Sequence, residues 1–105
     1  MASFREWMRR MAVLLRVSVD RATQEQFNEL EVRVGQTMMQ AGGPPEGLMS
    51  HVVYPEEEGF VLSEVWRAPD EGQTYLDTVV RPLMSELGLS AGETTVSQVW
   101  SFARP

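Results

Sequence analysis

Two residues of this sequence have the chemistry of an acid–base pair. His51 is the one side chain whose ordinary pKa lies near physiological pH, and Glu64 is a carboxylate set among apolar, strand-forming residues. A histidine can take a proton from a phenol or an acidic carbon, and a neighbouring carboxylate can orient its ring. We therefore predict His51 and Glu64 as catalytic residues, with His51 removing a proton and Glu64 positioning the ring.

Structural roles remain open for both residues. His51 could be a half-buried strand histidine that a neighbour satisfies. Glu64 is costly to bury unless it is paired, so it could form an ion pair with Arg16 or Arg81. The acid–base pair requires a hairpin register that brings the two side chains to the same face of the sheet.

Five further residues are predicted to contact a substrate: Met49, Leu62, Trp66, Tyr75 and Arg81. Trp66 could stack on an aromatic ring, while Tyr75 and Arg81 could hold an anionic oxygen as it develops. By strand alternation Met49 shares a face with the histidine and Leu62 with the glutamate, where they would line an apolar pocket. The alternatives are core packing for the tryptophan and the methionine, and surface or capping roles for Tyr75 and Arg81.

The composition excludes several classes of function. The chain has 105 residues, nine of them arginine and none lysine, with no cysteine and one histidine. Schiff-base chemistry, disulfides, thiolate nucleophiles and His-rich metal sites are therefore excluded within one chain. The net charge of −6 argues against a nucleic-acid partner, and we interpret the acidic run at residues 56–58 as a solvated turn. We expect no metal and no cofactor.

The hydropathy pattern predicts the order β-α-β-β-α-β. Strands are predicted over residues 11–20, 47–54, 59–67 and 94–103, and helices over about 24–40 and 69–88. Thr23 and Gln26 have the spacing of a capping box at the start of the first helix. Pro82 should kink or break the second helix near residues 80–81.

This order predicts an α+β, ferredoxin-like fold with a four-stranded antiparallel sheet and two helices on one face. The third strand is apolar on both faces, because Val61 and Val65 alternate with Phe60 and Leu62. The helices can cover only one face, so the other would expose an apolar patch. We therefore expect a homodimer in which sheet packs on sheet.

The N-terminal segment differs from the rest of the chain. Residues 1–10 are basic, and we predict an N-terminal arm there, followed by a single domain over residues 11–105. Arg16 interrupts the apolar run that follows, and no small-residue cleavage site succeeds it, so we expect a cytoplasmic protein without a signal peptide or membrane span. The arm could be a short helix that docks a partner, or the result of an upstream start.

Several motifs together resemble a known superfamily. They are the Thr23-x-x-Gln26 helix start, the strand that carries His51, the run GFVLSEVW at residues 59–66, and RPL at residues 81–83 with GL at residues 88–89. The chain resembles the dimeric α+β barrel superfamily, close to the antibiotic-biosynthesis-monooxygenase-like proteins. The resemblance implies a barrel-forming dimer with a pocket between helices and sheet, which in the monooxygenase branch takes polycyclic aromatic phenols without metal or flavin.

Haem degradation, another activity of that superfamily, is disfavoured. The haem-degrading members use an asparagine, a tryptophan and a histidine on a helix, whereas this chain has its asparagine at Asn28 on a helix and its histidine on a strand. We predict a cofactor-independent monooxygenase-like protein, or an isomerase, acting on an aromatic or polyketide-like molecule by base-assisted deprotonation. The alternative is a non-catalytic homodimer that binds a small hydrophobic ligand or is associated with stress.

Overall fold

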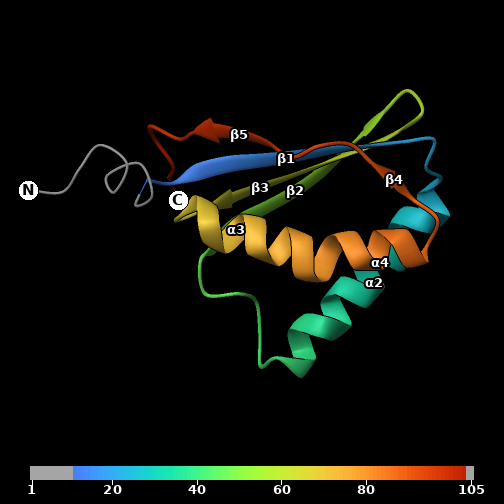
Figure 1. The fold of residues 1–105 in the computed structure, drawn as a ribbon, viewed down its shortest axis with the longest axis horizontal. Helices are drawn as coiled ribbons and strands as arrows, with labels where there is room; N and C mark the ends of the chain where they lie inside the picture. The colour runs from blue at the N-terminus through green and yellow to red at the C-terminus, as the bar shows by residue number, and fades with distance from the viewer. Residues whose placement is uncertain (1–10, 104–105) are drawn as a thin grey trace, which may run out of the picture.

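The computed structural model describes residues 11–103, which form a sheet covered on one side by helices (Figure 1). The elements in chain order are β1 (Val13–Asp20), α2 (Gln24–Gln40), β2 (Leu48–Glu56), β3 (Gly59–Trp66), α3 (Pro69–Tyr75), a π-helical turn (Leu76–Val80), α4 (Arg81–Glu86), β4 (Ser90–Ala91) and β5 (Thr95–Gln98). The predicted N-terminal arm lies outside the described residues.

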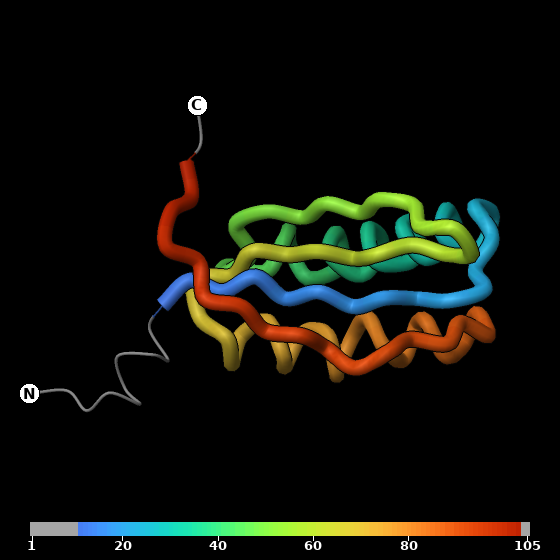
Figure 2. Tube along the Cα trace, turned by 90° about the horizontal axis from the view of Figure 1, so that it is seen from above, coloured from blue at the N-terminus to red at the C-terminus, as the bar shows by residue number. Residues whose placement is uncertain are grey.

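The sheet is antiparallel, with the order β2-β3-β1-β4, and β5 also pairs with β1 (Figure 2). The ferredoxin-like α+β prediction is confirmed. The last predicted strand is too long, since two short strands, β4 and β5, share the outer edge of β1 instead. The two are separated at Gly92, whose N–H donates to the Ser18 carbonyl over 2.8 Å.

Helix α2 begins and ends where the sequence predicts. The Thr23 side chain accepts from the Gln26 N–H, and the Gln26 side chain accepts from the Thr23 N–H, which completes the capping box. The helix ends before Gly42 and Gly43, which adopt φ values of 92° and 139° that favour glycine. Its apolar stripe buries Leu30 and Val34 against the sheet.

Pro82 disturbs the second helical segment without ending it. Its ring crowds the preceding turn and it has no N–H to donate. The chain widens ahead of it into the π-helical turn, in which the Arg81 N–H donates to the Leu76 carbonyl. The predicted break therefore takes the form of one wide turn between α3 and α4.

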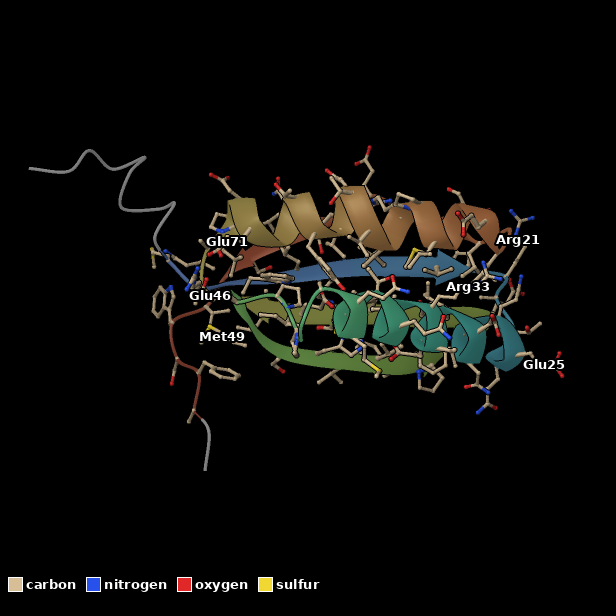
Figure 3. The ribbon with its side chains drawn as sticks, turned by 90° about the horizontal axis from the view of Figure 1, so that it is seen from below. Arg21, Glu25, Arg33, Glu46, Met49 and Glu71 are labelled. Carbon is tan, nitrogen blue, oxygen red and sulfur yellow. The ribbon has the colours of Figure 1, made fainter. Side chains whose placement is uncertain are left out.

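The core lies between the sheet and the two helical segments, which run side by side beneath it (Figure 3). Gly72 of α3 allows the closest approach. A Cβ atom at this position would lie 2.5 Å from Leu15 and 2.7 Å from the Trp66 ring, so glycine lets α3 sit directly against Trp66. Among the described residues, none of the helices has the length and hydropathy needed to cross a membrane.

The other face of the sheet is more polar than predicted. Val61 is 1% exposed although no helix of the described residues covers this face. A hydrogen bond passes over β3 beside Val61. In this bond the Arg16 guanidinium of β1 donates to the Tyr54 hydroxyl of β2 over 2.6 Å. Val52 remains 54% exposed, so the face carries an apolar position next to a polar bridge.

Candidate functional site

The hairpin register brings the predicted acid–base pair together. His51 of β2 lies opposite Glu64 of β3, and His51 Nδ1 is 2.9 Å from Glu64 Oε2. The second carboxylate oxygen of Glu64 accepts from the Trp66 indole N–H over 3.0 Å. Glu64 is only 2% exposed, and each of its two oxygens has a hydrogen-bond partner inside the protein, as a buried carboxylate requires.

A β-bulge changes which neighbours His51 has on its strand. The pairing of β2 with β3 shifts between Leu48 and Ser50, so Met49 is the extra residue of the bulge. Leu48, rather than Met49, stands opposite Trp66. Strand alternation predicted that Met49 shares a face with His51, and the bulge breaks that alternation.

Sequence analysis missed a third member of the cluster, Glu31 of α2. His51 Nε2 is 3.0 Å from Glu31 Oε1, and the Glu31 side chain is 38% exposed. Glu31 follows the buried Leu30 at the border of the apolar stripe of α2. That position was visible in the sequence, but which strand residue it meets depends on how the helix docks.

The two carboxylates determine the protonation state of His51. A neutral imidazole donates from one nitrogen only, whereas here both ring nitrogens face carboxylate oxygens. The hydrogen bond to Glu64 raises the pKa of His51 from 6.5 to about 9, with Glu31 adding to the rise and partial burial opposing it. His51 is therefore an imidazolium at neutral pH.

Tyr75 reaches the same cluster from α3. Its ring centre lies 5.5 Å from that of Trp66, and its buried hydroxyl has no hydrogen-bond partner within residues 11–103. Burial raises the pKa of the Tyr75 phenol to about 12, and the charges of Glu64 and Glu31 add to the rise. The π-helical turn begins directly after Tyr75, and such turns are frequent at functional sites.

Arg81 is not held near the cluster. Its guanidinium donates to the Gly92 carbonyl and to the Thr94 hydroxyl, each over 2.8 Å, so it is engaged by the segment between β4 and β5. The alternative in which Glu64 pairs with Arg16 or Arg81 is wrong, because Glu64 binds a histidine and an indole instead. The strand pattern places Glu64 on the helix face and gives no direct indication of which cation meets it.

A cavity of about 390 Å³ lies between the start of α2 and the β2–β3 hairpin. Apolar lining comes from Phe27, Val53, Pro55 and Phe60, and residues 56–58 add three glutamates. The predicted lining residue Leu62 is instead 2% exposed in the core.

The lining of this cavity does not include the Glu31–His51 pair. Phe27 precedes Glu31 by four residues on α2, so the two side chains lie on the same side of the helix. Val53 follows His51 by two residues on β2, so the two share a face of the strand. Glu31, His51, Glu64, Trp66 and Tyr75 are not part of the cavity lining; the cluster lies about one helical turn and one strand repeat farther along, roughly 5–7 Å.

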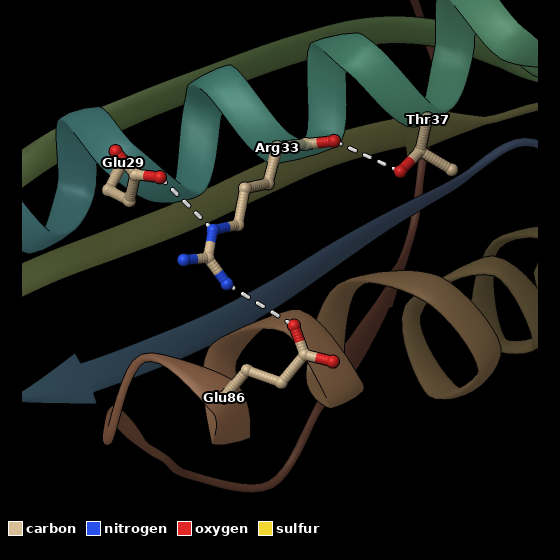
Figure 4. A network of polar contacts seen from close by, with 4 residues as sticks. All are labelled: Glu29, Arg33, Thr37 and Glu86. Atoms are coloured by element: carbon tan, nitrogen blue, oxygen red, sulfur yellow. Dashed lines mark hydrogen bonds and ion pairs between the residues drawn. The ribbon is translucent and has the colours of Figure 1, made fainter.

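A second charged network begins on the same helix (Figure 4). Arg33 Nε lies 3.1 Å from Glu29, and its Nη1 lies 3.3 Å from Glu86 of α4. The Thr37 hydroxyl donates to the Arg33 carbonyl over 3.0 Å. These side chains link α2 and α4 at the surface. Within residues 11–103 no group of three or more His, Asp and Glu side chains has the arrangement that a metal ion requires.

Several solved structures share this architecture. A protein from Deinococcus radiodurans assigned as an antibiotic biosynthesis monooxygenase matches with a TM-score of 0.60 and 15% identity, over 89% of this chain and 97% of its own. The cofactor-independent oxygenase SnoaB from Streptomyces nogalater, in a mutant form, gives a TM-score of 0.59 at 13% identity, over 89% and 96%. The chain has the fold of the antibiotic biosynthesis monooxygenases.

A third structure with this monooxygenase fold contains a ligand. The ActVA-Orf6 monooxygenase of Streptomyces coelicolor, in complex with nanaomycin D, matches with a TM-score of 0.56 and 15% identity, over 92% of this chain and 94% of its own. No protein-family model and no curated protein sequence matches the chain. The likeness to the antibiotic biosynthesis monooxygenases is therefore one of fold, and the chemistry of this chain must be argued from its own residues.

Proposed function

We propose that this protein is a cofactor-independent monooxygenase-like enzyme that deprotonates a small aromatic or polyketide-like molecule. The observation that carries the proposal is the pairing of His51 with the buried Glu64 on the helix-covered face of the sheet. The neighbouring folds support it, since SnoaB is a cofactor-independent oxygenase and ActVA-Orf6 was solved with nanaomycin D bound.

The cluster gives each residue a distinct role. Glu64 holds His51 Nδ1, and the imidazolium presents its Nε2–H, which Glu31 accepts in the resting protein, to the ionised oxygen of the substrate. His51 therefore stabilises the oxyanion and does not remove the proton as the sequence predicted, because the ring already carries a proton at neutral pH. Trp66 is 1% exposed and donates to Glu64, so it positions the carboxylate rather than stacking on a ligand. The Tyr75 hydroxyl has no partner among the described residues, so it is a spare donor for a substrate oxygen.

The reaction consumes molecular oxygen from solution. Deprotonation of a phenol activates a neighbouring CH2 group toward loss of a second proton, and the resulting carbanion supplies the electrons that reduce O2. One oxygen atom enters the product as a carbonyl and the other leaves as water, so CH2 and O2 become C=O and H2O. The substrate is its own reductant, so the sequence balances without a cofactor.

Oxygen uptake with dithranol, a dihydroxyanthrone with such a CH2 group, tests the proposal. We expect His51→Asn to lower kcat by roughly a hundredfold, since loss of one donor to a developing oxyanion costs about 10²–10³-fold. Glu29→Gln, on the exposed side of α2, should leave it unchanged. Wild-type oxygen uptake no faster than that of His51→Asn would contradict the proposed enzymatic function.

A second candidate function is ligand binding without turnover. The observation that favours it is that both nitrogens of His51 already have carboxylate partners. In that case para-nitrophenol would bind in the cavity and dithranol would be left intact. The two candidates therefore differ in oxygen uptake and agree in ligand binding.

We also propose that two copies pack sheet on sheet. Val52 is 54% exposed and Tyr54 is 36% exposed on the face that, within residues 11–103, no helix covers. A partner sheet would bury both, in the two-fold arrangement common among homo-oligomers. Sedimentation equilibrium tests this: Val52→Glu should shift the mass from dimer to monomer, and a monomeric wild type would contradict it.

A further inference from the structure

We infer that the cavity between the start of α2 and the β2–β3 hairpin binds a small organic cation, an ammonium group attached to an apolar or aromatic body. The lining of this cavity contains none of the residues of the His51 cluster. This second site is therefore independent of the reaction proposed at His51, and the inference goes beyond that function.

The apolar part of the lining suits the body of such a ligand. Phe27 of α2 and Phe60 of β3 contact each other edge to face, with ring centres 5.3 Å apart and ring planes at 64°. Val53 and Pro55 of β2 extend this apolar lining. The volume of about 390 Å³ lies within the range of roughly 300–1,000 Å³ that is typical of small-molecule sites, which are mostly apolar with a few polar groups.

The charged part of the lining is acidic. The glutamates at residues 56–58 line the cavity from the hairpin, and together with Asp20 they also line a second hollow that shares them. Among residues 11–103, no arginine lines either space, and none of these four carboxylates takes part in an ion pair. Carboxylates that lack a cation of their own attract a positively charged ligand.

The start of α2 would by itself favour an anion, because a helix N-terminus carries roughly half a positive charge. The capping box already uses two N–H groups there, since the Thr23 N–H donates to the Gln26 side chain and the Gln26 N–H donates to the Thr23 hydroxyl. Three carboxylates outweigh the partial charge of the helix start. The field inside the cavity is therefore negative, and it selects a cation over an anion of the same shape.

Aromatic rings add to the preference for a cation over a neutral molecule. Two phenylalanine rings line the cavity, and the face of an aromatic ring attracts a cation within about 6 Å of its centre. An ammonium group held by the glutamates gains from both attractions, while its apolar body packs against Phe27 and Val53. A neutral ligand of the same shape gains only the packing.

Equilibrium binding of three probes that share one ring and differ in charge tests the inference. The probes are 2-phenylethylamine, which is a cation at neutral pH, the neutral 2-phenylethanol, and the anion phenylacetate. By calorimetry we expect the amine to bind about tenfold more tightly than the alcohol, since several partly exposed carboxylates and a ring each add a small attraction. Phenylacetate should bind more weakly than the alcohol.

NMR locates the bound amine. We expect its largest amide shifts at residues 22–27 and 53–60, which include the cavity lining, and little change at the Trp66 indole or at Tyr75. Shifts confined to Trp66 and Tyr75 would place the ligand in the His51 cluster and overturn the inference.

A triple substitution with glutamine at residues 56–58 removes the charge of the lining. It should weaken amine binding about fivefold to tenfold and change alcohol binding by less than about twofold. The matched control carries three glutamine substitutions at exposed glutamates outside the lining, namely Glu46, Glu86 and Glu93. It changes the net charge equally and should bind the amine as wild type does, within about twofold. Equal losses in the two variants would overturn the inference.

A salt titration of the wild-type protein tests the charge without any substitution. Raising the salt from about 0.1 M to about 1 M shortens the screening length from about 10 Å to about 3 Å, so amine affinity should fall about threefold or more while alcohol affinity does not fall. Equal affinity for amine and alcohol, tighter binding of phenylacetate, or no amine binding at millimolar concentration would each overturn the inference. If the amine binds as expected and dithranol is left intact, the proposed reaction fails and this site stands.

Discussion

Helix α2 contributes to two networks with the same arrangement of charges and different chemistry. Glu29, Arg33 and Glu86 form one, in which a cation lies between two carboxylates at the surface. Glu31, His51 and Glu64 form the other, with the same alternation. The first contains a cation that stays charged at any relevant pH, while the second contains one that can lose its proton.

Burial accounts for the rest of the difference. The Glu29 and Glu86 side chains are 51% and 62% exposed, whereas Glu64 is 2% exposed. Water and salt screen the surface network, so it contributes little free energy. The buried carboxylate has only its protein partners, so the state of His51 depends on it. A titratable ion next to a buried carboxylate is what turns an ion-pair motif into a candidate site.

The largest expected effect breaks the inner network at its buried end. Glu64→Ala leaves His51 Nδ1 and the Trp66 indole N–H without their acceptor, and should lower the free energy of unfolding by about 3 kcal/mol. Glu86→Ala, at the end of the surface network, should lower it by less than about 0.5 kcal/mol. Urea unfolding at neutral pH compares the two, and equal losses would mean that burial does not separate the networks.

The next effect is a pH dependence that only the inner network can have. The pKa of His51 rises on folding from 6.5 to about 9, so the stability it contributes is fully present below about pH 6.5 and is lost as the pH rises through 9. We expect a loss of about 1–2 kcal/mol, less than the full pKa change implies, because the side chain is partly exposed.

Urea unfolding of wild type and His51→Asn between pH 6 and pH 10 measures this loss. The difference in stability between the two proteins should shrink as the pH rises, and NMR titration of the ring should give the pKa directly. A ring that titrates near 6.5 in the folded protein would show that the two carboxylates do not hold the proton.

The smallest effect concerns the surface network. Arg33→Met keeps the aliphatic stem and removes both ion pairs, and should lower the free energy of unfolding by less than about 1 kcal/mol. The loss should largely disappear at about 1 M salt, where the screening length falls to about 3 Å. A larger loss of stability that persists in salt would mean that solvent does not screen the surface network, as it does not screen the inner one.

Local patterns were sufficient to predict most of the fold. The capping box at Thr23 and the glycines after α2 set the bounds of that helix, and strand alternation identified β1 and β3 within a few residues. The C-terminal strand was overestimated because its alternation continues through Trp100, which is 90% exposed. Alternation shows that a segment could form a strand, but pairing requires a neighbour to reach it.

Contacts within the candidate site could be predicted only where strand geometry determines them. His51 and Glu64 meet because antiparallel partners on one face are adjacent. Glu31 was missed because the angle at which a helix docks does not follow from its own sequence. Alternation does not hold at Met49, because a bulge inserts one residue without a sequence signal. The partners of Arg81, the Gly92 carbonyl and the Thr94 hydroxyl, belong to a segment whose path the sequence pattern does not give.

The place of β2 at the outside of the sheet has a consequence for solubility. Within residues 11–103 this strand pairs with β3 alone, so its other edge could add a strand from another molecule and begin aggregation. Pro55 has no N–H to offer such a strand, and the glutamates at residues 56–58 repel a copy of themselves. The three glutamates that line the cavity therefore also protect the exposed edge of β2 from pairing. Neutralising these carboxylates should make the protein more prone to assemble into fibres.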